Sequence, residues 1–131
     1  MSKTAIIYGL EARLALKAGV DVVANVVKCT MGPGGSSVAY KPPLGPVRIT
    51  HDGVSAAGGI RLGNGFVQVG ADIAIEACRL TNTTAGDGTT TTAVLTQAIT
   101  DAAHRMVAAG VDPMRLRYGI AAAVGRVDQS L

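Results

Sequence analysis

The stretch AGDGTTTTAV, residues 85–94, places one carboxylate between two glycines and follows it with four threonines and an apolar run. Helix capping explains one such side chain, because Asp or Thr accepts hydrogen bonds from the first free amides of a helix. Capping does not explain four threonines in a row, since each costs a helix about half a kcal/mol relative to Ala. The excess indicates that this helix start also binds a ligand.

A phosphate group fits this pattern. The free N–H groups and the positive end of a helix dipole attract an anion, and threonine hydroxyls add further donors. Gly86 and Gly88 let the backbone approach closely, and Asp87 offers a hard oxygen ligand of the kind Mg²⁺ prefers. We therefore predict that the stretch binds a magnesium–nucleotide complex. It is not a Walker loop, because no Gly-Lys-Ser/Thr follows.

Two other glycine-containing turns carry polar groups, and each has two interpretations. TMGPGG, residues 30–35, is typical of a helix end with Gly32 at the position after the cap, but its glycines also allow a ligand near the backbone. In THDG, residues 50–53, Asp-Gly is a strong hairpin-turn signal. The following VSAAGG is a poor return strand, so Asp52 has a second possible reason to be exposed.

Composition narrows the class of protein. Of the 131 residues, 48% are hydrophobic but only 3% are aromatic, so the core must be built from Ala, Val, Ile and Leu. This favours close helix packing through small residues and argues against stacking of nucleobases on aromatic side chains. The net charge is only +3 and the arginines are spread out, so we expect no nucleic-acid partner.

The remaining composition signals predict a cytoplasmic protein without a membrane partner. The N-terminus does not read as a signal peptide, and no apolar run reaches the roughly 18–20 residues that span a bilayer. Cys29 and Cys78 lack partners at metal-ligand spacing, which predicts two buried thiols in a reducing compartment.

Hydrophobic periodicity predicts a mainly α fold with a small β element. We expect short strands at 6–9, 37–40 and 47–50, a tight turn at 51–54 and a loose segment after it. Helices are expected over 10–29, over 66–80, from the opening stretch to a Gly110 cap, and from Asp112-Pro113 toward Val127. The predicted core stripes are Leu10, Leu14, Val23, Val26 and Val27; Phe66, Val69, Ile73, Ala77 and Leu80; and Leu95, Ala98, Ile99, Ala102 and Met106. These stripes need more cover than the predicted elements offer, so the domain is expected to be incomplete.

TMGPGG, ITHDGVS and AGDGTTTTAVL, in this order and spacing, resemble the start of a chaperonin subunit. DPMRLRYGI, residues 112–120, is more similar to the group I, bacterial GroEL type than to other chaperonins. The resemblance implies that residues 1–131 are the N-terminal portion of an equatorial domain, the helical ATPase domain that forms the ring. The hinge, the apical domain and the C-terminal equatorial part are absent. The implied activity is ATP-dependent folding or refolding of other proteins by a homo-oligomeric ring, with unfolded substrates and a co-chaperonin bound by the apical domain.

The resemblance also implies roles for individual residues. Thr30, Met31, Gly32 and Pro33 would line the nucleotide. Asp87 would hold Mg²⁺, and Gly88, Thr89, Thr90 and Thr91 would cradle the phosphates, beside Gly86. Asp52 would sit near the γ-phosphate and assist hydrolysis, with His51 and Gly53 in its turn. The aspartate that positions the attacking water belongs to the absent hinge, so these 131 residues alone are expected to be inactive.

Departures from the family pattern leave two other interpretations open. His51 and Gly34 stand where chaperonins usually have lysines, and a histidine is mostly neutral at pH 7. A non-catalytic, chaperonin-like scaffold that has lost ATP turnover fits these changes. A small helical interaction module that only reuses the fold is the third interpretation.

Overall fold

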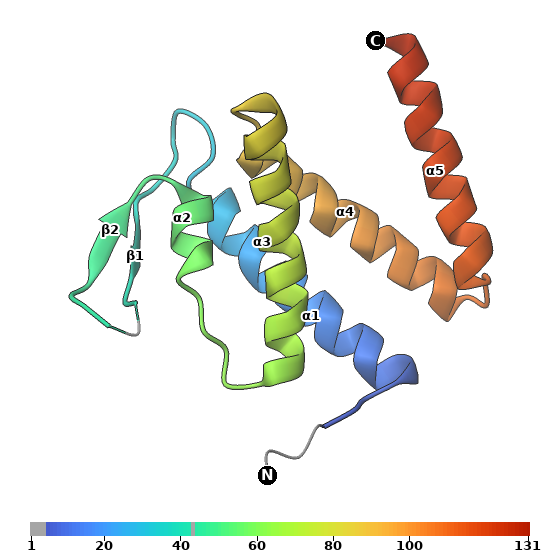
Figure 1. Cartoon of the computed structure of the whole chain (residues 1–131), viewed down its shortest axis with the longest axis horizontal. Helices are drawn as coiled ribbons and strands as arrows, with labels where there is room; N and C mark the ends of the chain where they lie inside the picture. The colour runs from blue at the N-terminus through green and yellow to red at the C-terminus, as the bar shows by residue number, and fades with distance from the viewer. Residues whose placement is uncertain (1–4, 43) are drawn as a thin grey trace. The chain divides into compact units, whose positions relative to one another are not determined.

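The computed structural model describes residues 5–42 and 44–131, which form helices and one two-stranded sheet (Figure 1). The elements are α1 (Gly9–Lys28), β1 (Val38–Tyr40), β2 (Arg48–Thr50), α2 (Gly53–Gly58), α3 (Gly65–Ala85), α4 (Thr89–Ala108) and α5 (Pro113–Ser130). The chain divides into two compact units, one up to Thr100 and one from Asp101. The mainly α prediction with a small β element is confirmed.

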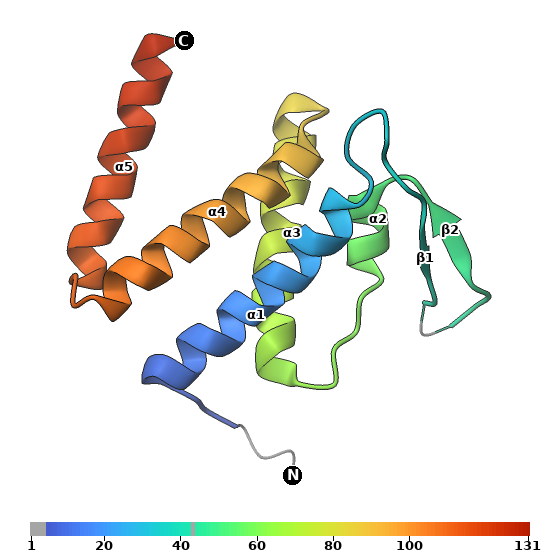
Figure 2. The same cartoon turned by 180° about the vertical axis from the view of Figure 1, so that it is seen from behind.

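Two glycines let α1 and α3 pack directly against each other in the first unit, as both views of the molecule show (Figures 1 and 2). A Cβ atom at Gly19 of α1 would lie 2.1 Å from the Val67 carbonyl oxygen, and one at Gly70 of α3 would lie 2.1 Å from the Leu16 carbonyl oxygen. The helical cost of Gly19 is thus offset by backbone-to-backbone contact. The expectation of close packing through small residues is confirmed.

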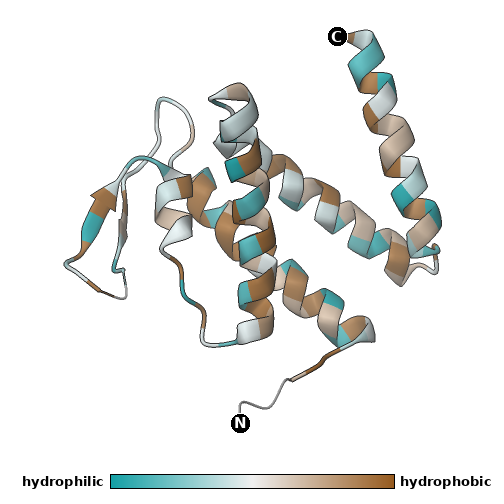
Figure 3. Ribbon diagram, viewed as in Figure 1, coloured by the Kyte–Doolittle hydropathy of each residue, from teal (hydrophilic) through white to brown (hydrophobic). Residues whose placement is uncertain are grey.

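The core lies between α1, α2, α3 and the start of α4. It consists of Val20, Val23, Val27, Ala57, Ala71, Ala74, Ile75, Cys78 and Ala93. The stripe predicted for 66–80 was wrong, because Val69, Ile73 and Leu80 are exposed while the face with Gly70 and Ala74 is buried. The close approach of α1 selects the small-residue face of α3 and leaves the larger side chains outside. Figure 3 shows brown, hydrophobic segments interspersed with hydrophilic ones along α1 and α3.

The other predicted stripes are also partly exposed. Leu10 and Leu14 in α1, and Leu95, Ile99 and Met106 in α4, are at least 44% exposed. Val23 and Val27 are fully buried, as predicted. Apolar periodicity therefore located the helices correctly but not the face that each one buries.

The sheet follows the predicted strand positions, with β1 and β2 antiparallel and Ala39 opposite Ile49. The strand predicted at 6–9 was wrong: residues 5–8 form no strand, and Gly9 already begins α1 with a φ of +66°. The tight turn expected at 51–54 was also wrong, whereas the loose segment expected after it is present from Gly59 to Asn64, once α2 has ended. Asp52 instead caps the short helix α2 by accepting the Val54 N–H.

The second unit confirms the predicted helix signals. Gly110 has a φ of +95°, its N–H donates to the Val107 carbonyl, and the Val111 N–H donates to the Met106 carbonyl, which is a Schellman motif closing α4. Asp112 then caps α5 by accepting the Arg115 N–H at 2.9 Å, with Pro113 at the first helical position. Within the part of the chain that the structure describes, no helix has the length and apolarity needed to cross a membrane.

Candidate nucleotide-binding site

Two glycines in the left-handed region form the turn between α3 and α4. Gly86, with a φ of +76°, caps α3 by donating its N–H to the Asn82 carbonyl at 2.9 Å, and Gly88 has a φ of +84°. A side chain at either position would strain the backbone. Asp87 lies exposed between them and accepts the Gly88 N–H at 2.6 Å. The turn thus presents one carboxylate directly ahead of a helix N-terminus.

The threonine run opens α4 and divides into two parts. Thr92 is structural, because its hydroxyl donates to the Gly88 carbonyl at 3.0 Å and to the Thr81 hydroxyl at 2.9 Å. The Thr92 N–H also donates to the Gly88 carbonyl, which starts the helical pattern. The amides of Thr89, Thr90 and Thr91 therefore belong to the first turn, where no preceding helical carbonyl reaches them. Such amides suit phosphate oxygens.

Asp52 reaches its position as the N-cap of α2. One carboxylate oxygen accepts the Val54 N–H at 3.1 Å, the other accepts the Ser55 hydroxyl, and the Asp52 N–H donates to the Thr50 hydroxyl at 3.0 Å. The carboxylate is exposed and fixed in direction by these bonds. His51 is exposed as well, and its ring lies within 3.2–3.3 Å of the Ser37 hydroxyl.

Gly53 holds the Asp52 turn against the end of α1. A Cβ atom at Gly53 would lie 2.7 Å from both the Thr30 hydroxyl oxygen and the Val27 Cα atom. Thr30 is itself fixed, because its hydroxyl donates to the Val27 carbonyl at 2.8 Å. The structure therefore brings two of the three predicted motifs into direct contact: residues 30–35, the Thr30 loop, and residues 50–53, the Asp52 turn.

The Thr30 loop is more than a helix terminus. α1 ends at Lys28, and Cys29 is its C-cap in the right-handed conformation. One interpretation placed Gly32 directly after the cap, and that placement was wrong. Gly32 has a φ of +77°, and its carbonyl accepts the Gly35 N–H at 3.0 Å in a turn that includes Pro33. Met31 is half exposed.

A cavity of about 890 Å³ joins the Asp52 turn to the start of α4, because Asp52 and Thr89 both line it. This volume is in the range of small-molecule sites. The other predicted site residues are not part of its lining: Thr30, Met31, Gly32, Pro33, His51, Gly53, Gly86, Asp87, Gly88, Thr90 and Thr91. The cavity is also lined by polar residues that were not predicted from the sequence: Ser55, Arg61, Arg79, Asn82 and Thr83. Asn82 and Thr83 follow Arg79 by three and four residues, so they share one helical face with it, and this spacing could have indicated a polar surface.

The predicted metal ligand, Asp87, is a single carboxylate. Among residues 5–42 and 44–131, no group of three or more His, Cys, Asp and Glu side chains is placed to hold a metal ion. Asp87 nevertheless fits Mg²⁺, which is usually held by one or two carboxylates together with phosphate oxygens and water. A magnesium ion at Asp87 would thus depend on the nucleotide for its other ligands.

The two cysteines differ, and the prediction of two buried thiols was half wrong. Cys29 is exposed at the end of α1, where its thiol donates to the Asn25 carbonyl at 3.2 Å. Cys78 is fully buried in α3, and burial raises the pKa of its thiol.

We expect a thiol reagent such as Ellman's reagent to modify Cys29 in the folded protein and to modify Cys78 at least about a hundredfold more slowly, because the thiolate is the reactive form and needs access. The Cys29→Ser and Cys78→Ser variants assign the two phases, and both thiols should react at similar rates in concentrated urea. Equal rates in the folded protein would contradict the burial of Cys78.

Residues 23–131 match the TCP-1/cpn60 chaperonin family. The chain belongs to this chaperonin family. The chaperonin motifs AGDGTTTTAVL, ITHDGVS and TMGPGG all lie in the matched region. The resemblance seen in the sequence is thus confirmed at the level of the family.

Solved chaperonin structures have the same fold. The chaperonin gp146 from bacteriophage EL 2 (Pseudomonas aeruginosa), crystallised in the presence of ATP-BeFx, is 34% identical over 75% of this chain and 18% of its own, with a TM-score of 0.66. A group III chaperonin in the open state is 26% identical over 88% of this chain and 23% of its own, with a TM-score of 0.75. The chain therefore spans about a fifth of the length of these chaperonins. The two structures come from a phage and from group III, so the group I assignment stays a prediction.

Proposed function

We propose that this chain is the N-terminal portion of the equatorial ATP-binding domain of an ATP-dependent chaperonin subunit, of the group I type. The observation that carries the proposal is the turn at Gly86–Gly88, which presents the exposed Asp87 beside the first-turn amides of α4. That turn lies next to the cavity shared by Thr89 and Asp52. The phage relative crystallised with ATP-BeFx adds support for a nucleotide in this family.

Each residue has a defined task in this proposal. The amides of Thr89–Thr91 donate hydrogen bonds to the phosphate oxygens, while Asp87 holds Mg²⁺, which neutralises charge on the phosphates when bound. Residues 30–33 of the Thr30 loop line the nucleotide. Asp52 lies near the γ-phosphate and assists hydrolysis, since phosphoryl transfer depends mainly on positioning and electrostatic stabilisation.

The remaining parts of the proposal concern the longer protein. ATP hydrolysis would drive the folding or refolding of other proteins by a homo-oligomeric ring in the cytoplasm. Unfolded substrates and a co-chaperonin would bind an apical domain that lies outside residues 1–131. No nucleic-acid or membrane partner is part of this function.

A non-catalytic scaffold is the second candidate. His51 favours it, because the ring lies against the Ser37 hydroxyl at the β hairpin and supplies no lysine-like cation beside Asp52. Gly34 likewise places no side chain in the Thr30 loop.

The Asp87→Ala variant tests the proposal by calorimetry on the full-length subunit. We expect the dissociation constant of Mg²⁺-ATP to rise about tenfold, which is roughly 1.4 kcal/mol, because one metal ligand is lost while the amides of α4 remain. Binding of ATP in the presence of a chelator should change by less than about twofold, since Asp87 acts through the metal.

Asp128→Ala is the matched control, because Asp128 is an exposed aspartate on α5. This variant should bind Mg²⁺-ATP like the unmodified protein. Equal affinities in the Asp87→Ala variant and the unmodified protein would remove the role of Asp87. An unmodified protein that binds no Mg²⁺-ATP at micromolar concentration would favour the scaffold.

A further inference from the structure

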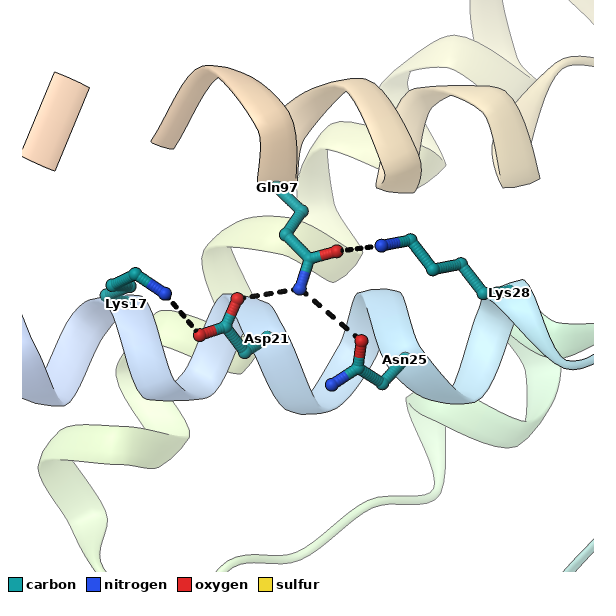
Figure 4. A network of polar contacts seen from close by, with 5 residues as sticks. All are labelled: Lys17, Asp21, Asn25, Lys28 and Gln97. Atoms are coloured by element: carbon teal, nitrogen blue, oxygen red, sulfur yellow. Dashed lines mark hydrogen bonds and ion pairs between the residues drawn. The ribbon is translucent and has the colours of Figure 1, made fainter. Parts of the chain in front are cut away.

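Gln97 lies at the centre of a polar network between α1 and α4 (Figure 4). Its side-chain amide nitrogen donates to Asp21 at 2.7 Å and to Asn25 at 3.4 Å, while its oxygen accepts from the Lys28 ammonium. Asp21 also pairs with Lys17 at 2.6 Å. The network therefore binds one residue of α4 to successive turns of α1.

Gln97 is one of only two residues that α4 buries among those the structure describes. The other is Ala93, one helical turn earlier. Ala93 packs into the hydrophobic core, but apolar contact is non-directional and one methyl group tolerates sliding. Hydrogen bonds have preferred lengths and angles. Gln97, which is only 8% exposed, is therefore a directional contact that can fix how far α4 is displaced along α1, while the Thr92–Thr81 hydrogen bond joins α4 to α3.

The charges on α1 make the network persistent near neutral pH. Burial by itself raises the pKa of the Asp21 carboxyl, but hydrogen bonds from Lys17 and Gln97, together with the charges of Lys17 and Lys28, outweigh burial and hold the pKa below its ordinary value. Asp21 thus remains an anion that accepts from Gln97. Charge-assisted hydrogen bonds of this kind are stronger than neutral ones.

The network connects the two halves of the candidate nucleotide site. Lys28 is the last residue of α1, just before the Thr30 loop, and Gly53 packs the Asp52 turn onto that loop. Gln97 lies on α4 about two helical turns after Thr89, so the helix carries any displacement at Gln97 to the phosphate-binding turn. One half of the site follows Lys28 along the chain, and the other begins the helix that carries Gln97.

We propose that Gln97 is a positioning residue that sets the spacing between the Thr30 loop, with its attached Asp52 turn, and the first turn of α4. The spacing itself follows from the contacts of Gln97, whereas its effect on ATP turnover rests on the proposed function. Gln97 touches no reacting atom in this proposal. It acts through the helices to which it is bonded.

A polarity swap separates positioning from general stability. Gln97→Glu places a carboxylate against Asp21, where the two facing atoms are now 2.7 Å apart, and so replaces a hydrogen bond with repulsion. The double variant Asp21→Asn with Gln97→Glu reverses the pair. The amide nitrogen at position 21 then donates to the carboxylate at position 97, which still accepts from Lys28. The amide oxygen at position 21 still accepts from Lys17.

In the full-length protein, we expect Gln97→Glu to lower kcat for ATP hydrolysis about tenfold while the dissociation constant of Mg²⁺-ATP changes less than about threefold, because misplacement of about 1 Å is enough to cost such a factor in rate. The polarity-swapped double variant should recover kcat to within about threefold. Gln68→Leu is the control, because Gln68 on α3 accepts the Leu62 N–H and donates to Asp72, neither of which lies on α1 or α4, and its loss should leave kcat unchanged.

The second measurement needs no nucleotide. Nitroxide labels on Cys29 and on a Thr91→Cys variant report the distance between the two halves by pulsed electron paramagnetic resonance. We expect Gln97→Glu to shift or broaden this distance distribution and the double variant to restore it. A distance and a kcat that stay the same in all variants would overturn the positioning role. A shifted distance in a protein without ATP turnover would retain that role and overturn the proposed function instead.

Discussion

Gly70→Ala is expected to destabilise the first helical unit by about 3 kcal/mol or more, although it adds only one methyl group. The new Cβ atom would lie 2.1 Å from the Leu16 carbonyl oxygen and 2.8 Å from the Leu16 Cα atom. Both are backbone atoms, so no side-chain rotation relieves the clash, and α1 and α3 must move apart. Overpacking of a core costs typically 1–3 kcal/mol even when side chains can adjust.

Thermal unfolding followed by circular dichroism measures this effect. Gly119→Ala and Gly125→Ala are the matched controls, because both glycines lie inside α5 and a Cβ atom at either would meet nothing within 4 Å. Each control should be neutral or stabilising by up to about 1 kcal/mol, since Ala favours a helix over Gly. A Gly70→Ala variant as stable as these controls would contradict the close helix contact.

Asp52→Asn is expected to reduce ATP turnover about 100-fold while the free energy of unfolding changes by less than about 1 kcal/mol. Asn is as good an N-cap as Asp, so its side-chain oxygen can still accept the Val54 N–H and hold α2 in place. The substitution removes the negative charge with which Asp52 is proposed to assist hydrolysis near the γ-phosphate. Asp52→Ala, in contrast, should lose both turnover and about 1 kcal/mol of helix capping.

Steady-state hydrolysis and calorimetric Mg²⁺-ATP binding on the full-length subunit distinguish these effects. Asp112→Asn makes the same chemical change at the N-cap of α5, whose oxygen accepts the Arg115 N–H, and should leave turnover unaltered. Full turnover in the Asp52→Asn variant would mean that Asp52 serves only as a helix cap. The role of the carboxylate in hydrolysis would then be wrong.

Local sequence signals determined where the helices and strands lie. Gly110 ends α4, and Asp112-Pro113 begins α5, through caps whose hydrogen bonds involve only neighbouring residues. The β1–β2 pair and the glycine turn around Asp87 are equally local. For the same reason, the motifs that identified the chaperonin family could be recognised without any knowledge of packing. The tight turn predicted at Asp52 was wrong because Asp-Gly is typical of hairpin turns, whereas here Asp52 caps α2.

Only the tertiary structure decided which faces are buried and which side chains meet. The larger apolar residues of α3 predicted the wrong face, since the contact of Gly19 and Gly70 with opposite backbones brings α1 onto the small residues instead. The cavity next to Asp52 and the bonds of Gln97 to α1 join residues remote in sequence, so no local pattern reveals them. The sequence by itself determined the elements and the family, because these depend on neighbouring residues. Burial and the geometry of the site depend on how helices pack, and small residues set that packing here.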